Sequence, residues 1–285
     1  MSGVDDGGRP LGKTALPATL GEERAGMAPR LIGGFQDLLL RIVPWAAVVL
    51  IWFAIPASGL VNPALVPTPL QVAMKFWELM TTQKLWLDML TSVQRVTVGL
   101  LLGISLAVPV GFLLGWYRPA RTLIDPLINF FRSLPPIALI PLVIVYFGID
   151  EMAKIVMLFY AAFFSGVIVM YEGILQTNPL FIRVARTLGA SDGEIFRRVI
   201  VPLALPHVLT ALRVALGVCW ATLVASELIA AQRGLGAVIQ NASNYFQIDT
   251  IYVGIISIGL VALVMDRCLR AIASRLLEWQ ERMAP

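Results

Sequence analysis

Long apolar stretches recur along this chain, and they constrain its fold more than any other feature. A helix that crosses a bilayer needs about 20 mostly apolar residues, because a helix satisfies its own backbone hydrogen bonds in hydrocarbon. Six stretches meet this description, at about 38–60, 93–117, 124–147, 152–174, 206–231 and 250–273. The sequence therefore predicts an all-α integral membrane protein, with six transmembrane helices in one membrane domain over residues 35–280.

The overall composition agrees with a membrane location. Apolar residues make up 58% of the chain and the mean hydropathy is +0.80, above the range of ordinary soluble domains. Residues 1–34 differ, because they are rich in glycine, proline and charged residues and contain no apolar core of a signal peptide. We expect them to form a disordered cytosolic tail.

Basic residues are unevenly distributed among the segments that connect the spans. They gather before the first span, between the second and third, between the fourth and fifth, and after the sixth. The positive-inside rule then places both termini in the cytoplasm. The formal net charge of +4 is accounted for by these positions next to lipid, so it does not indicate nucleic-acid binding.

The third apolar stretch contains four prolines, at positions 126, 135, 136 and 141. Prolines at this density do not fit one straight helix, so a broken helix is expected. Arg132 and Ser133 come just before the break. Backbone carbonyls exposed there could line a cavity on a translocation pathway. Arg132 could equally serve as an anchor at the cytosolic membrane boundary.

The polar, arginine-rich segment 178–202 lies between two apolar spans and contains signals for ordered structure. A first helix, Pro179–Leu188, begins with proline at its first position and ends at Gly189, which tolerates a left-handed cap. Ser191 and Glu194 have the spacing of a capping box that starts a second helix. Prolines at 202 and 206 are expected to bend the chain toward the next span. The segment is predicted to be a cytosolic docking platform.

This segment resembles the EAA loop of bacterial ABC-importer permeases. Ala185, Gly189 and Pro202 have the family's spacing, while Arg183 stands where the family has glutamate. In that family the loop is the coupling helix that the cytosolic ATPase grips. The resemblance implies ATPase-docking roles for Arg183, Ala185, Arg186, Gly189, Ala190, Ser191, Glu194 and Pro202.

A wider resemblance covers roughly residues 38–280. The stretches RSLPPIALIPLVIVYFGI (132–149) and ASELIAAQRGLG (225–236) look like permeases for taurine, aliphatic sulfonates and nitrate, with taurine permeases most similar. The resemblance implies a type I importer fold in the bacterial inner membrane. It also implies a homodimer, two cytosolic ATPase subunits and a periplasmic or lipid-anchored binding protein, with ATP and Mg²⁺ held by the ATPases.

This chain is not expected to catalyse a reaction by itself. It has no GxxxxGK[ST] nucleotide loop, no HExxH motif and no GxSxG elbow, and it contains a single histidine. We therefore expect no catalytic residue, no metal site and no cofactor bound by this chain.

Two charged residues interrupt the fifth apolar stretch, and such residues are functional candidates. Arg213 lies near its cytoplasmic end, where its side chain could reach the interface. Glu227 has two interpretations. It could accept hydrogen bonds from the Arg233–Gly236 turn or the Arg233 side chain and fix an outer gate, or it could face the translocation pathway and contact a substrate amine.

Small residues recur every four positions in the second apolar stretch, at Gly99, Gly103, Ala107, Gly111 and Gly115, and in the fifth at Gly217, Ala221 and Ala225. Such ribbons allow helices to approach closely. The partner helix could belong to the same chain or to a second copy.

Two other functions remain open at this point. One is a permease for nitrate or another small anion in the same family. The other is an ion-driven secondary carrier, which would need an internal repeat and buried titratable pairs, and neither is evident in the sequence.

Overall fold

The computed structural model describes residues 28–59, 62 and 65–277, and all regular structure in these residues is helical. The chain divides into an N-terminal unit, Met1–Leu60, and a C-terminal unit, Val61–Pro285. Each unit is described by itself.

In its described residues, the N-terminal unit contains helix α1 (Ala28–Ala57), which includes Pro44 and Pro56. Its part from Ile42 to Ala57 is apolar but shorter than the length required of a span. The helix begins ten residues before the predicted first span at 38, and it overlaps the predicted tail over residues 28–34. The remaining tail residues, 1–27, and the predicted end of the span at Leu60 lie outside the described residues.

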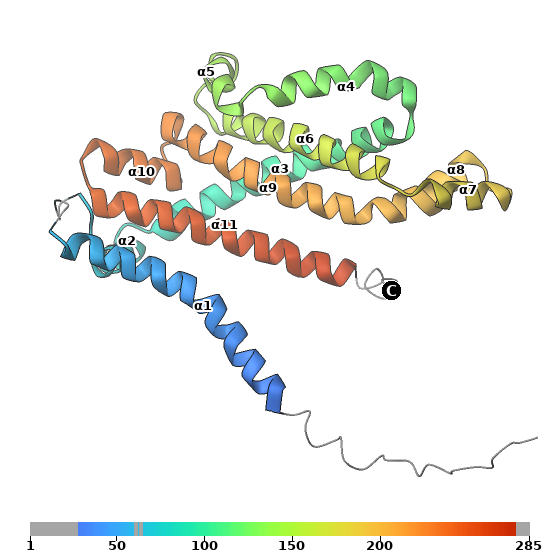
Figure 1. Cartoon of the computed structure of the whole chain (residues 1–285). Helices are drawn as coiled ribbons and strands as arrows, with labels where there is room; N and C mark the ends of the chain where they lie inside the picture. Colours follow the sequence, from blue (N-terminus) through green and yellow to red (C-terminus); the bar gives the residue numbers. More distant parts are fainter. Residues whose placement is uncertain (1–27, 60–61, 63–64, 278–285) are drawn as a thin grey trace, which may run out of the picture. The chain divides into compact units, whose positions relative to one another are not determined.

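The C-terminal unit is built around three long helices that lie side by side: α3 (Leu85–Trp116), α6 (Glu151–Leu175) and α9 (Val201–Ala230). Figure 1 shows α4 and α5 on one side of these helices and α10 and α11 on the other. The remaining elements are α2 (Pro69–Thr81), α4 (Arg118–Ser133), α5 (Pro136–Phe147), α7 (Pro179–Thr187), α8 (Asp192–Ile195), the π-helix η1 (Phe196–Ile200), α10 (Leu235–Asn244) and α11 (Ile248–Leu276).

The small-residue ribbon of α3 packs against α6 of the same chain. A Cβ atom added at Gly99, Gly103 or Gly111 would overlap side chains of α6, namely Leu158, Ala162 and Met170. This close approach supplies van der Waals contact between helices where lipid gives little hydrophobic driving force. The ribbon of α9 differs, since Gly217 and Ala221 are exposed and Gly217 has no neighbour within 4 Å of an added Cβ atom.

Four helices of the described residues are long and apolar enough to cross a membrane, namely α3, α6, α11 and the run Asp192–Ile229. The pair α4 and α5 makes a fifth if it is counted as one broken span, because the two helices meet at an angle of 92°. The predicted break is thus confirmed. Pro135 and Pro136 supply no N–H donors at the junction, and the Tyr160 hydroxyl donates to the carbonyl of Phe131 there.

The predicted bend at Pro202 and Pro206 is wrong. Residues 192–229 form one helical run of 38 residues, so the fifth span has no separate start at Pro206. The π-helical turn η1 precedes Pro202, and Val201 closes it by donating its N–H to the carbonyl of Phe196. Such a local adjustment accommodates a proline within a helix, because it rearranges the backbone bonds that the ring would break.

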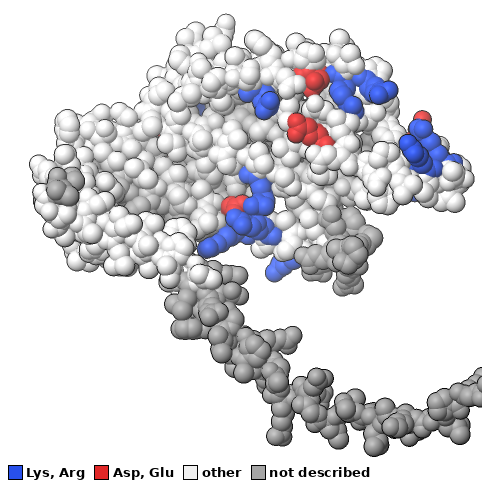
Figure 2. Space-filling model, viewed as in Figure 1, with Lys and Arg blue, Asp and Glu red and all other residues white. Residues whose placement is uncertain are grey.

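Helix α2 precedes α3 and begins at Pro69. Thr68 caps it, and Gln71 completes a capping box by accepting from the Thr68 N–H at 2.8 Å. Charged side chains are sparse on the face shown in Figure 2, where they gather on the half that carries α7, α8 and the C-terminal end of α11. Most of the remaining face carries no charge, as expected of a surface that meets lipid.

Candidate functional site

The first helix of segment 178–202 forms as its local signals predict. Asn178 caps α7 by accepting from the Leu180 N–H at 2.9 Å, and Pro179 occupies the first turn. Gly189 has φ +82°, so the predicted left-handed cap is present. The N–H groups of Gly189 and Ala190 donate to the carbonyls of Arg186 and Ala185, which closes the helix end.

The predicted capping box of the second helix is also present. The Ser191 N–H donates to the Glu194 carboxylate at 3.0 Å, and the Glu194 N–H donates to the Ser191 hydroxyl at 3.4 Å. A further link was not predicted, because Arg186 on α7 forms an ion pair with Asp192 on α8 at 3.1 Å. This ion pair links the two helices across Gly189.

Helix α7 buries none of its residues in the chain. Most of its large apolar side chains are instead exposed: Leu180, Phe181, Val184 and, at the cap, Leu188, which is 81% exposed. Arg183, Arg186 and Pro202 are exposed as well, while Ala185 and Ala190 are half-buried. An ordered helix pair that presents apolar side chains beside arginines is suited to contact another protein.

The second helix is anchored in the bundle by aromatic packing. The Phe196 ring in η1 lies 5.6 Å from the Phe112 ring and 5.8 Å from the Trp116 ring, both at the C-terminal end of α3. Its neighbours Ile195 and Ile200 are fully buried. Because η1 continues into α9, α8 is joined to a long helix without a break.

Glu227 lies at the opposite end of α9 and is buried, with 1% of its surface exposed. Its carboxylate accepts hydrogen bonds from the Ser92 hydroxyl at 2.9 and 3.0 Å and from the Gly236 N–H at 2.8 Å. It also accepts from Arg95 Nη1 at 2.6 Å. The expected hydrogen bond to the Arg233–Gly236 turn is present, but the Arg233 side chain is not a partner.

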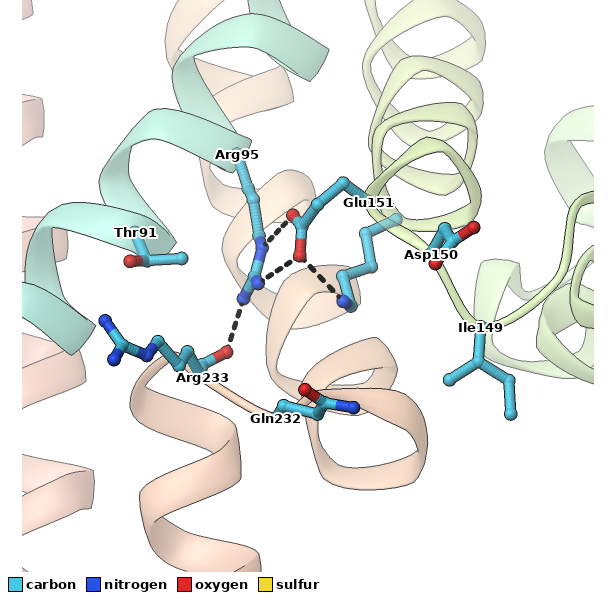
Figure 3. Close-up of a pocket in the computed structure, with 8 residues that line it drawn as sticks. Thr91, Arg95, Ile149, Asp150, Glu151, Gln232 and Arg233 are labelled. Atoms are coloured by element: carbon cyan, nitrogen blue, oxygen red, sulfur yellow. Dashed lines mark hydrogen bonds and ion pairs between the residues drawn. The ribbon is translucent and has the colours of Figure 1, made fainter.

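Arg95 of α3 also bonds to α6 and to the turn after α9, as Figure 3 shows. It donates through Nε and Nη2 to Glu151 of α6, each at 2.6 Å, and through Nη1 to the Arg233 carbonyl at 2.7 Å. Lys154 donates to the same Glu151 carboxylate at 3.0 Å. We call Ser92, Arg95, Glu151, Lys154 and Glu227 the polar cluster.

Two more hydrogen bonds attach the turn after α9 to α3. The Gly234 N–H donates to Asp88 and the Leu235 N–H donates to Ser92, each at 3.0 Å. Gly234 has φ +119°, and an added Cβ atom would meet the Glu227 carboxylate and Arg95. Only glycine fits this position without strain. The turn is therefore held by hydrogen bonds to Asp88 and to the polar cluster.

Sequence reasoning missed most of this cluster. Arg95 was the available signal, because a charged residue inside an apolar stretch is expected to have a buried partner. Its partners could not be found from spacing, since Glu151 lies 56 residues away and Glu227 lies 132 residues away. The predicted absence of buried titratable pairs is corrected by the Arg95–Glu227 pair.

A cavity of about 420 Å³ opens beside the polar cluster. Figure 3 shows its lining, with Asp150 on the α6 side and Arg233 on the turn after α9. Within the part of the chain that the structure describes, the side chains of Asp150, Gln232 and Arg233 have no hydrogen bond or ion pair. The lining residues are Thr91, Arg95, Ile149, Asp150, Glu151, Lys154, Gln232 and Arg233, and we call this the polar cavity.

The remaining predicted residues lie elsewhere. Arg132 and Ser133 are exposed at the end of α4, where the Ser133 hydroxyl donates to the Phe130 carbonyl at 2.7 Å, and neither lines the polar cavity. Arg213 has a partner that was not predicted, because it forms an ion pair with Asp266 of α11 at 3.2 Å. Glu227 itself is buried behind the cavity and is absent from its lining.

Comparison with known proteins adds to this geometry. Residues 99–278 match the family described as "Binding-protein-dependent transport system inner membrane component". The chain is 45% identical over 256 residues to a protein of Brucella abortus (strain 2308) named "Probable ABC transporter permease protein", covering 90% of this chain and all of the relative. It is 35% identical over 249 residues to the taurine transport system permease protein TauC of Escherichia coli (strain K12), covering 86% of this chain and 90% of the relative.

Among solved structures, the chain is similar to an inward-facing conformation of the MetNI methionine ABC transporter. The TM-score is 0.55 at 23% identity, and the match covers 67% of this chain and 99% of that chain. At this identity the likeness concerns the fold.

Proposed function

The chain belongs to the family of binding-protein-dependent transport system inner membrane components and is a permease subunit of an ABC importer, and we propose that this importer carries taurine or a related sulfonate. It is a multi-pass protein of the inner membrane. The observation that supports the substrate best is the 35% identity to the E. coli taurine permease over 86% of the chain. A sulfonate is a strong acid, so it stays anionic on both sides of a membrane and needs a shielded path through hydrocarbon.

The proposed topology has six spans with both termini in the cytoplasm. The positive-inside rule supports it, because arginines gather on segment 178–202 and around the end of α11. In this orientation α7 and α8 lie in the cytoplasm. The polar cavity then opens at the outer face, where a binding protein would deliver substrate.

We propose that segment 178–202 is the surface on which a cytosolic ATPase docks. The exposed apolar side chains of α7, the ion pair between Arg186 and Asp192 and the packing of Phe196 support this role. They describe a rigid surface joined to a long helix, which is what mechanical coupling requires. ATP and Mg²⁺ would be held by the ATPase, and this chain would bind no cofactor of its own.

The proposed assembly contains two copies of this chain, two ATPases and one periplasmic or lipid-anchored binding protein. The exposed small residues of α9, Gly217 and Ala221, agree with close packing against a second copy. Closure of the ATPases on ATP would then change the pore from inward-facing to outward-facing.

The candidate function from another class is an ion-driven secondary carrier. The buried Arg95–Glu227 pair would suit it. However, the Glu227 carboxylate is held by Ser92, Arg95 and the Gly236 N–H, so it lacks the free proton-accepting position that a relay requires. The arrangement favours a structural role for Glu227, as the first of the two sequence-based interpretations proposes.

Deletion of the gene tests the proposal. Growth on taurine as the sole sulfur source should be lost, while growth on sulfate should be unchanged. Loss of nitrate uptake with normal growth on taurine would instead assign the chain to a nitrate importer. Purification of the tagged chain should recover an ATPase, and recovery of the chain alone with full ion-driven uptake would contradict the ABC importer.

A further inference from the structure

Arg213 of α9 is joined to Arg270 of α11 through one carboxylate. Asp266 Oδ1 accepts from Arg213 Nε at 3.2 Å, while Asp266 Oδ2 accepts from Arg270 Nε at 2.7 Å and from its Nη2. Arg267 follows Asp266 on α11, is exposed, and has no ion pair within the described residues. Figure 2 shows basic side chains gathered around an acidic one where the C-terminal half of α11 lies. We call Arg213, Asp266, Arg267 and Arg270 the arginine cluster.

The arginine cluster carries more positive charge than its carboxylate compensates. Three arginines share Asp266, which leaves two positive charges in excess. Arg213 reaches Asp266 through Nε alone, so both of its Nη groups still offer N–H donors. The side chains of Arg213 and Arg270 are 46% and 57% exposed. Exposed guanidinium groups with free donors are suited to phosphate oxygens, which accept charge-assisted hydrogen bonds from them.

An apolar stripe leads along α11 to the arginine cluster. Ile256, Leu260 and Leu263 are 41%, 49% and 38% exposed. Arg267 and Arg270 continue the same alternating spacing of four and three residues and are exposed as well. Residues at this spacing lie on one face of a helix. We call Ile256, Leu260 and Leu263 the α11 stripe. One exposed face is therefore apolar at one end and cationic at the other, which matches the polarity of a phospholipid.

The length and position of the α11 stripe also suit an acyl chain. Arg267 follows Ile256 by eleven residues, which is about 16 Å along a helix, and one leaflet of a bilayer supplies about 15 Å of hydrocarbon. Among the four long apolar helices of the described residues, α11 is the least buried. In its most apolar stretch 22% is buried, against at least 39% in the others. The exposed face of α11 is therefore open to lipid.

We propose that the arginine cluster and the α11 stripe bind an anionic phospholipid. The phosphate accepts hydrogen bonds from Arg213, Arg267 and Arg270, and an acyl chain lies along the α11 stripe. Basic groups between transmembrane helices bind anionic headgroups at the membrane surface in this way. In the proposed topology the bound lipid belongs to the cytoplasmic leaflet. The lipid site stands whichever anion the importer carries.

Two other occupants fit this face less well. A small hydrophilic anion would pair with the arginines but would leave the α11 stripe uncovered. A second copy packed symmetrically on this face would bring its own arginine cluster toward the first, so like charges would meet. A phospholipid satisfies the charge and covers the apolar residues together.

The test uses native mass spectrometry to count the lipids bound to the full chain, purified in nonionic detergent together with its ATPase. The probes are phosphatidylglycerol and phosphatidylcholine with identical acyl chains, which differ in the net charge of the headgroup. The variants are Arg267→Gln and Arg270→Gln. Arg118→Gln is the matched control, because Arg118 is also exposed but lies at the start of α4, on the other side of the three long helices.

The natural chain should bind phosphatidylglycerol at least about tenfold more tightly than phosphatidylcholine, since two uncompensated charges attract it. Arg267→Gln and Arg270→Gln should each weaken phosphatidylglycerol binding by about fivefold and change phosphatidylcholine binding by less than about twofold. Arg118→Gln should change neither by more than about twofold. Arg267 has no ion pair among the described residues, so its replacement tests the lipid contact without breaking one in the fold. Glycerol 3-phosphate and taurine, each in large excess, should displace no lipid, because neither covers the α11 stripe.

Equal binding of the two lipids would overturn the proposal. An equal loss of phosphatidylglycerol binding in Arg118→Gln would overturn it too, because surface charge in general would then be sufficient. Displacement by glycerol 3-phosphate would make the arginine cluster a site for soluble phosphates, and displacement by taurine would place it on the substrate path. A dimer that binds no lipid would assign this face to the second copy.

Discussion

Replacement of Arg95 by methionine is expected to destabilise the permease because it leaves the Glu227 carboxylate buried without a cation. Loss of the bond to Glu151 should contribute little. Arg95 has a 5% exposed side chain and pairs with both Glu151 and Glu227. The Glu151 side chain is 58% exposed and keeps Lys154 after the replacement, so water and lysine compensate its charge. Glu227 is 1% exposed and has no second cation among the described residues.

The expected losses of folding free energy follow from these environments. Removing one partner of a buried ion pair costs about 3–5 kcal/mol, which is the loss expected for Arg95→Met. Glu227→Gln should cost less, about 1–3 kcal/mol, because Arg95 keeps Glu151 and the amide oxygen still accepts from the Gly236 N–H. Glu151→Gln, as the matched control, should cost less than about 1 kcal/mol, as for other exposed pairs.

The double replacement of Arg95 by methionine and Glu227 by glutamine isolates the interaction free energy between these two side chains. It removes both buried charges, so its loss should be smaller than the sum of the two single losses by about 2 kcal/mol. The measurement is the apparent melting temperature of each purified variant in detergent, read from tryptophan fluorescence under one heating rate. Additive losses, or a loss for Glu151→Gln as large as that for Glu227→Gln, would refute the reasoning.

Transport by Glu227→Gln separates the two roles considered for this residue. As a structural anchor, the variant should transport taurine at a nearly normal rate, while Glu227→Ala should lose folded protein. Selective loss of taurine uptake in a well-expressed Glu227→Gln permease would favour the pathway role and contradict the geometry of the polar cluster.

Three further predictions concern other parts of the chain. Gly189→Val should leave the permease in the membrane but uncouple ATP hydrolysis from uptake, because φ +82° strains a β-branched residue by about 1–3 kcal/mol; normal uptake would contradict this. Phe196→Ala should lower uptake while pull-down assays still recover the ATPase, because it removes the packing on Phe112 and Trp116. Gly103→Leu should abolish folded protein by forcing α3 off α6, whereas Gly259→Ala on α11, with open space around it, should not.

Local signals in the sequence predicted local structure well. Pro179 starts a helix, Ser191 and Glu194 form their capping box, and Gly189 takes the left-handed conformation. Each of these features depends on residues within a turn of one another, so spacing alone identifies them. The break before Pro136 belongs to the same class, because a proline's missing N–H acts on its own helix.

Of two other predictions, the bend at the prolines was wrong and the six-span topology stays a prediction. The prolines at 202 and 206 do not bend the chain, because the π-helical turn η1 accommodates them within a continuous helix. The six-span topology remains a proposal, since four or five spans are found among the described residues and α1 is apolar over a shorter length.

The sequence by itself determined that this chain enters a membrane, that a helix starts at Pro179 and closes at Gly189, and that segment 178–202 is ordered, because each depends on composition or short-range spacing. Only the tertiary structure decided which residues meet across the bundle. The pairing of Arg95 with Glu227, the packing of the α3 glycines on α6 and the polar cavity all join residues more than 50 positions apart. Such contacts depend on how helices are placed beside one another, and helix periodicity in one chain does not specify that placement.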